Sequence, residues 1–163
     1  MRSCRPVSAV RSWWLACEEK RRSARKYSST RSALRSSDDA IASIRATFGG
    51  TAVAYTEPVP GYLLAAAGLV NRTPQEFSTA IEEGTDPTPQ AVAETDALFT
   101  GRQVKVLLYN AQASSPITDQ LRQLAQQNGI PVVPVTETLT PATASFQAWQ
   151  LGQVRALTRA LGG

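Results

Sequence analysis

The chain has 163 residues, of which 42% are apolar, and its formal net charge is +4. This length suits one domain with a sizeable core, and no apolar run approaches the roughly 18 residues of a membrane-spanning helix. The sequence has no histidine, which excludes Ser-His-Asp and Cys-His catalytic sites and every imidazole-dependent zinc motif within this chain.

The positive charge belongs to the N-terminal segment. Residues 1–45 carry eleven Lys or Arg against four Asp or Glu, whereas residues 46–163 carry six against nine. Residues 1–37 are rich in Arg and Ser and have no sustained apolar period, so we expect a disordered or non-native segment. Cys4 and Cys17 lack CxxC spacing, which predicts free thiols rather than a metal site.

Three interpretations of residues 1–37 are open. The run Lys20-Arg21-Arg22 would suit a nucleic-acid-binding tail. The residues that end in Cys17 resemble the cleavage site of a lipoprotein signal, but Arg11 interrupts the apolar region that such a signal needs. A truncated or out-of-frame gene start fits the abrupt change of composition at Asp38, and we favour it. We therefore expect no nucleic-acid partner, and a cytoplasmic location if the chain is made as written.

The ordered pattern begins at Asp38. An apolar stripe predicts the end of a helix over 38–50, because the pair Gly49-Gly50 is a typical helix stop. A β-branched run then predicts a strand at 53–56, and a loop with two prolines leads into a helix over 61–67. A short further strand is expected near 69–71.

Four Ser/Thr-Pro pairs predict helix starts, because the hydroxyl can cap a helix and proline suits its first position. They stand at 73–74, 88–89, 115–116 and 140–141. The first pair is followed by Gln75-Glu76, which predicts a capping box. The last pair predicts the start of a long final helix.

Apolar runs at 104–109 and 130–135 predict two more strands, each separated from its neighbours by helices. Alternation of helices with near-continuous apolar strands is typical of a parallel sheet that is covered on both faces. We therefore predict an α/β fold, a three-layer sandwich with a small, mostly parallel sheet of about four strands. This domain would occupy residues 51–163.

Polar residues follow three of the predicted strands where each ends: Thr56 and Glu57, then Asn110 and Gln112, then Thr136 and Glu137. Carboxyl ends of parallel strands meet at one edge of a sheet, which is where ligands bind in such folds. Oxygen donors of this kind suit divalent cations, although a single loop glutamate is more often only solvated. The alternatives are a polar organic ligand bound through Asn110 and Gln112, or an enzyme or interaction module that uses the same crevice. Phosphate-loop and dinucleotide motifs do not occur.

Residues 40–163 resemble the C-terminal lobe of the zinc/manganese solute-binding proteins of metal ABC transporters. The stretches that carry the resemblance keep their order and spacing, and lie at 44–50, 54–62, 84–89, 104–112 and 129–137. The resemblance implies two lobes joined by a long helix, whose end would be residues 38–50, and one metal ion in the cleft. It implies delivery of that ion to a membrane permease, a periplasmic or cell-surface location, and no enzymatic activity.

The resemblance also implies metal ligands in this chain. Glu57 falls where zinc-type members have His and manganese-type members have Glu, and Glu137 falls at the closing carboxylate of the family. Thr56, Asn110, Gln112 and Thr136 would then surround the ligands. The chain departs from the family in having no His, no N-terminal lobe and no recognisable secretion signal. We therefore expect a truncated lobe that binds Zn²⁺ or Mn²⁺ only weakly by itself.

Overall fold

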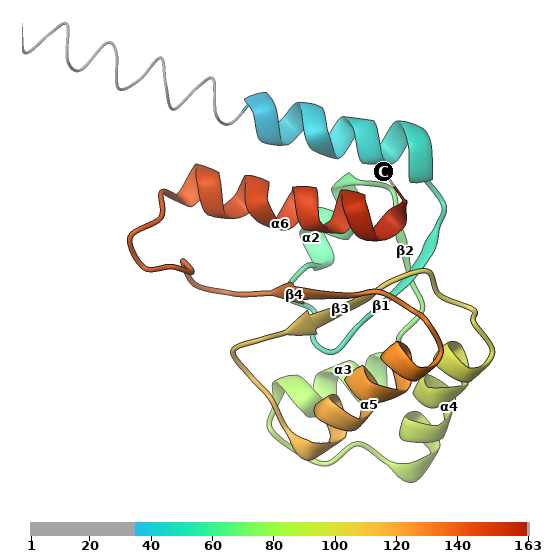
Figure 1. Ribbon diagram of the computed structural model, residues 1–163. Coiled ribbons are helices and arrows are strands. Elements are labelled where there is room, and N and C mark those ends of the chain that lie inside the picture. The colour runs from blue at the N-terminus through green and yellow to red at the C-terminus, as the bar shows by residue number, and fades with distance from the viewer. Residues whose placement is uncertain (1–34, 163) are drawn as a thin grey trace, which may run out of the picture.

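The computed structural model describes residues 35–162. Its sheet has four strands, all parallel, in the order β2-β1-β3-β4 (Figure 1). The strands are β1 (Ala52–Tyr55), β2 (Val70–Asn71), β3 (Leu107–Asn110) and β4 (Val132–Val135). Every predicted strand is therefore present, with shifted bounds. Cys4, Cys17 and the three interpretations of the N-terminal segment concern residues outside the described range, save residues 35–37.

Helices cover both faces of the sheet. An N-terminal helix, described from residue 35 to residue 48, lies with α2 and α6 on one face, and α3, α4 and α5 lie on the other (Figure 1). The bounds are α2 (Gly61–Ala66), α3 (Gln75–Glu82), α4 (Pro89–Thr100), α5 (Pro116–Gln127) and α6 (Phe146–Leu161). The predicted three-layer α/β sandwich is confirmed. The N-terminal helix already includes residues 35–37, upstream of the expected boundary at Asp38.

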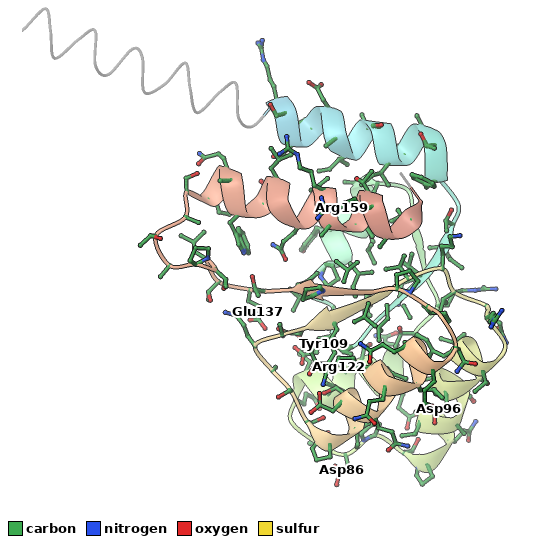
Figure 2. The ribbon with its side chains drawn as sticks, viewed as in Figure 1. Asp86, Asp96, Tyr109, Arg122, Glu137 and Arg159 are labelled. Carbon is green, nitrogen blue, oxygen red and sulfur yellow. The ribbon has the colours of Figure 1, made fainter. Side chains whose placement is uncertain are left out.

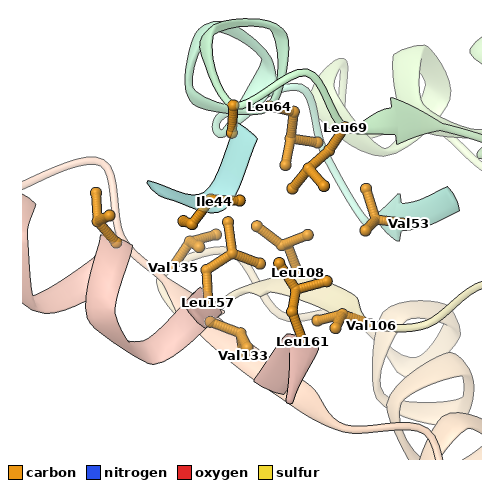
Figure 3. Packing of buried hydrophobic residues seen from close by; sticks show 12 residues of the cluster. Ile44, Val53, Leu64, Leu69, Val106, Leu108, Val133, Val135, Leu157 and Leu161 are labelled. Atoms are coloured by element: carbon orange, nitrogen blue, oxygen red, sulfur yellow. The ribbon is translucent and has the colours of Figure 1, made fainter. Parts of the chain in front are cut away.

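Alternation along the strands divides the core in two. Val53 and Leu108 face the N-terminal helix, α2 and α6, where they pack with Ile44, Leu64 and Leu157 (Figure 3). Their chain neighbours Ala54 and Leu107 point to the opposite face and pack with Phe77, Phe99 and Leu121 of α3, α4 and α5. Both faces of the central strands β1 and β3 are thus buried, which explains why their sequences are mostly apolar.

Two of the Ser/Thr-Pro pairs begin helices as predicted. Thr88 caps α4, since its hydroxyl accepts a hydrogen bond from the backbone N of Ala91 at 3.2 Å. Ser115 caps α5 and forms a capping box with Thr118. In both helices the proline occupies the first turn, where its missing N–H leaves no bond unmade.

The other two pairs do not cap helices, so the caps predicted at Thr73 and Thr140 are wrong, although α3 does begin at Gln75, directly after Thr73-Pro74. Thr73 Oγ1 accepts a hydrogen bond from the backbone N of Tyr55 and donates one to its carbonyl O, both at 3.0 Å. This hydroxyl joins the end of β1 to the chain after β2, and α3 begins without a side-chain cap. The final helix begins at Phe146 with Ser145 as its cap, beyond Thr140-Pro141. At Thr73 the hydroxyl therefore bonds to β1 instead of capping α3. After Thr140-Pro141 the helix begins later, because Ser145 supplies its cap.

No helix within residues 35–162 combines the length and the apolar character that crossing a membrane requires.

Asp96 on α4 gives a test of the fold that depends on pH. Its pKa is raised because partial burial removes water from the charged form. Stability is then greatest below the usual pKa of 3.8 and is partly lost as the pH rises through the raised value. We expect Asp96→Asn to increase the free energy of unfolding by about 0.5 kcal/mol at pH 7 and to change nothing at pH 3. Urea unfolding at both pH values checks this, and an equal gain at both would contradict it.

Candidate metal centre

Strand register brings the predicted polar residues together at the carboxyl edge of the sheet. Tyr55 pairs with Leu108 and Asn110 pairs with Val135, so the residues that follow β1 and β4 flank the end of β3. Glu137 lies at this edge in Figure 2. Glu57 and Asn110 are buried, with 6% and 1% of their surface exposed, whereas Glu137 is exposed.

The side-chain amide of Asn110 joins the two carboxylates. Its Nδ2 donates to Glu57 Oε2 and to Glu137 Oε1, both at 2.8 Å. Two carboxylates held this close repel each other by about 1–4 kcal/mol, depending on how strongly water screens them. The shared amide offsets that repulsion because each carboxylate gains a charge-assisted hydrogen bond. Glu57 and Glu137, predicted as a pair from separate strand ends, are therefore brought together by a third residue.

One oxygen of Glu57 stands apart from this arrangement. Oε1 is buried, and within residues 35–162 it has no hydrogen-bond partner. A buried carboxylate oxygen without a donor carries a desolvation cost, and such groups in folded proteins usually have an explanation in function. A bound cation would satisfy this oxygen. Its burial therefore distinguishes Glu57 from a solvated loop carboxylate.

Thr56 does not face the site as a ligand. Its hydroxyl oxygen accepts a hydrogen bond from the backbone N of Asn110 at 3.0 Å, in a fully buried position. This bond extends the pairing of β1 with β3 beyond the strand ends, since the backbone N of Thr56 also donates to Leu108 O. Thr56 therefore fixes the main chain beneath Glu57 and Asn110.

Gln112 fixes the loop that follows β4. Its Oε1 accepts hydrogen bonds from the backbone N of Glu137 at 2.7 Å and from that of Thr138 at 3.1 Å. Its Nε2 donates to Thr138 Oγ1 at 2.6 Å, and its own backbone N donates to Asn110 Oδ1 at 3.0 Å. Gln112 thus positions Glu137 through the main chain rather than by contact with its carboxylate.

Thr136 is bonded to α6, through two residues that the sequence reasoning missed. Trp149 Nε1 donates to Thr136 Oγ1 at 2.8 Å, and the backbone N of Thr136 donates to Gln153 Oε1 at 3.0 Å. Trp149 and Gln153 are four residues apart, so they lie on the same side of the helix. That spacing was visible in the sequence, but nothing there indicated which strand end this side of the helix would meet.

An open depression of about 980 Å³ lies over these residues. Both carboxylates line it, together with Thr136, and aromatic side chains of Tyr62, Phe146 and Trp149 form part of its wall. Tyr62 and Phe146 are exposed, with 95% and 51% of their surface accessible. The depression is therefore open to water, with aromatic side chains along part of its rim.

Tyr109, the residue before Asn110, belongs to a different cluster on the α5 side of the sheet (Figure 2). Its hydroxyl donates to Asp119 Oδ1 at 2.9 Å, while Arg122 lies over its ring and pairs with Asp119 at 3.0 Å. Burial, together with the neighbouring Asp119 carboxylate, raises the pKa of Tyr109. The phenol is therefore neutral at physiological pH, and it anchors α5 rather than joining the site.

The described residues bring two acidic side chains together at this edge and no more. Within residues 35–162, no three His, Cys, Asp or Glu side chains come together in a group that could hold a metal ion. Asn110 has both amide hydrogens engaged by the carboxylates, so it offers no donor to a polar organic ligand. Donation from Asn110 to a polar organic ligand, the alternative given above, would therefore require one of these bonds to break.

A parallel sheet with polar groups at its carboxyl edge defines an α/β ligand-binding domain. The chain belongs to the ZnuA family, described as zinc-uptake complex component A, periplasmic, whose sequence pattern matches residues 15–160. None of the curated proteins matches the chain. Membership of this family confirms the resemblance drawn from the sequence, and identifies the class as periplasmic metal-binding components of ABC uptake systems.

Proposed function

We propose that this chain captures a divalent metal ion for an ABC-type uptake system, with Glu57 and Glu137 as its ligands. The observation that carries the proposal is the shared amide of Asn110, which holds two carboxylates within hydrogen-bond reach of one nitrogen. The buried, unpartnered Oε1 of Glu57, unpartnered among the described residues, supports it further. Family membership supplies the physiological setting, uptake of metal from outside the cytoplasmic membrane.

Each residue has a separate task in this proposal. Glu57 and Glu137 supply oxygen donors, Asn110 fixes their separation, and Gln112 and Thr136 hold the loop that carries Glu137. The captured ion is cargo, which the protein would release to a membrane permease in the periplasm or at the cell surface. Capture and release of the ion involve no covalent reaction, so in this proposal the protein acts by binding and not as an enzyme.

Zinc is the cargo that we propose. A glutamate in place of histidine moves the donor set toward oxygen, which suits Mn²⁺. Affinities at a given site nevertheless rise from Mn²⁺ to Zn²⁺ in the Irving–Williams order, and the family is described by zinc uptake. Two carboxylates fill only half of a four-coordinate zinc shell. The described residues should therefore bind Zn²⁺ weakly, and the other ligands would come from groups that close over the depression.

Calorimetric titration with Zn²⁺ and Mn²⁺ tests the ligand assignment. We expect weak binding by the wild-type chain, and a further loss of about 10-fold or more in Glu57→Gln, since even residues behind the ligands contribute that much at metal sites. Glu83→Gln is the matched control, because Glu83 is an exposed glutamate at the end of α3 outside the depression.

Two outcomes would count against the proposal. Equal affinities of Glu57→Gln and Glu83→Gln would remove Glu57 from the ligand set. Tight binding of one Zn²⁺ per wild-type chain would contradict the incomplete set of ligands, because two carboxylates and water do not hold zinc tightly.

A further inference from the structure

We infer that Asn110 is a positioning residue that sets the metal selectivity of the site, because its amide engages one oxygen of each carboxylate and leaves the other oxygen as the stronger ligand. This inference rests on the proposed function of Glu57 and Glu137 as ligands. It concerns which ion the site accepts, and it assigns that choice to a residue that does not itself contact the ion.

The orientation of the Asn110 amide is fixed by its surroundings. Its Oδ1 accepts a hydrogen bond from the backbone N of Gln112 at 3.0 Å. A backbone N–H can only donate, so this partner assigns the oxygen, and the nitrogen must face the carboxylates. The side chain is 1% exposed, and its backbone N is held by Thr56 Oγ1. The amide therefore cannot turn to present its oxygen to a metal ion without breaking these bonds.

Both hydrogens of Asn110 Nδ2 are used, one for each carboxylate. They occupy Oε2 of Glu57 and Oε1 of Glu137. The remaining oxygens are Oε1 of Glu57 and Oε2 of Glu137, and neither accepts a hydrogen bond within residues 35–162. Each engaged oxygen keeps a lone pair, but the amide hydrogen beside it repels a cation. Each glutamate is therefore biased toward monodentate coordination through its other oxygen.

Monodentate carboxylates suit some ions better than others. Zn²⁺ is usually four-coordinate, and one oxygen from each carboxylate suffices for it. Ca²⁺ requires six to eight oxygens and commonly uses both oxygens of a glutamate. An amide that engages one oxygen of each glutamate therefore weakens two ligands that Ca²⁺ would use, whereas Zn²⁺ does not need them.

Replacing Asn110 tests the inference through a ratio of affinities. In Asn110→Ala we expect Zn²⁺ to bind about 10–100-fold more weakly, as on removal of other residues that orient metal ligands. The affinity for Ca²⁺ should stay the same or rise, because two carboxylate oxygens are released. The Zn²⁺/Ca²⁺ ratio should therefore fall by about 10-fold or more. Competition calorimetry with the two chloride salts measures this ratio.

Two further variants separate positioning from damage to the fold. Asn110→Ser keeps one O–H donor for one carboxylate and should give an intermediate ratio, while leaving a smaller gap in the core. Asn71→Ala, at a partly buried asparagine of β2 that bonds only to Thr73, is the control and should keep the wild-type ratio. Circular dichroism before titration establishes that each variant is folded.

The possible results are distinguishable. If Zn²⁺ and Ca²⁺ affinities fall in proportion in Asn110→Ala or Asn110→Ser, the residue acts only on the fold and the inference is overturned. Should the wild-type chain bind Ca²⁺ as tightly as Zn²⁺, the inference fails without any variant. If wild type binds neither ion and Glu57→Gln changes nothing, it is the proposed function that fails.

Discussion

Asn110→Asp is expected to lower the free energy of unfolding by about 3–5 kcal/mol at pH 7 in metal-free buffer, as breaking a buried charged network does. The substitution keeps the shape of the side chain but removes both donors that Glu57 and Glu137 share. Three carboxylates would then meet at the same edge of the sheet. Urea unfolding monitored by circular dichroism measures the loss.

The same variant should recover stability as the pH falls. The introduced carboxyl is buried beside two other carboxylates, and this raises its folded-state pKa above the usual value of about 4. The penalty is then complete above the raised pKa and fades as the pH falls toward 4, because a protonated carboxyl regains an O–H donor. Asn71→Asp, which keeps the acceptor for the backbone N of Thr73, is the control and should cost less than about 1 kcal/mol. A loss in Asn110→Asp that is the same at pH 5 and pH 7 would show that repulsion is not its cause.

Leu157→Ala is expected to cost about 2–5 kcal/mol of stability, the range found for buried leucines. Leu157 is fully buried on the inner side of α6, where it packs in the core between this helix and the sheet (Figure 3). The cavity would loosen the helix that holds Thr136 through Trp149 and Gln153. Thermal unfolding, with hydrogen exchange of the α6 amides, measures both effects.

Arg155→Ala provides the comparison for Leu157→Ala on the same helix. Arg155 is exposed, so its removal should change stability by no more than about 0.5 kcal/mol. If Leu157→Ala were as mild as Arg155→Ala, the packing of α6 against β3 and β4 described above would be wrong.

The fold was predictable because its strands are buried on both faces. An apolar run such as Leu107-Leu108 is compatible with few other arrangements once helices are seen on either side of it. Helix caps were predictable only where the cap is local, as at Thr88 and Ser115. At Thr73 the helix start was predicted correctly but the cap was not, because the hydroxyl bonds to Tyr55, 18 residues away.

The residues of the candidate site could be predicted from the sequence, but the hydrogen bonds among them could not. The ends of parallel strands had to meet, so Glu57, Asn110 and Glu137 were expected in one crevice. The different roles of the four residues around the carboxylates were not predicted. Asn110 joins the carboxylates, whereas Thr56, Gln112 and Thr136 make bonds that fix the chain at the strand ends. Hydrogen-bond partners depend on side-chain directions at the strand ends, and no spacing in the sequence encodes them.

Because the amide of Asn110 is shared, the candidate site depends on folding of the whole sheet. Asn110 lies 53 residues from Glu57 and 27 residues from Glu137 in the sequence. An unfolded chain therefore has no site, and the site arises only when three strands have come into register. An ion that binds the folded chain alone adds to its stability by mass action. Where the free ion approaches the dissociation constant, the proposed cargo would therefore also protect the folded chain from proteolysis.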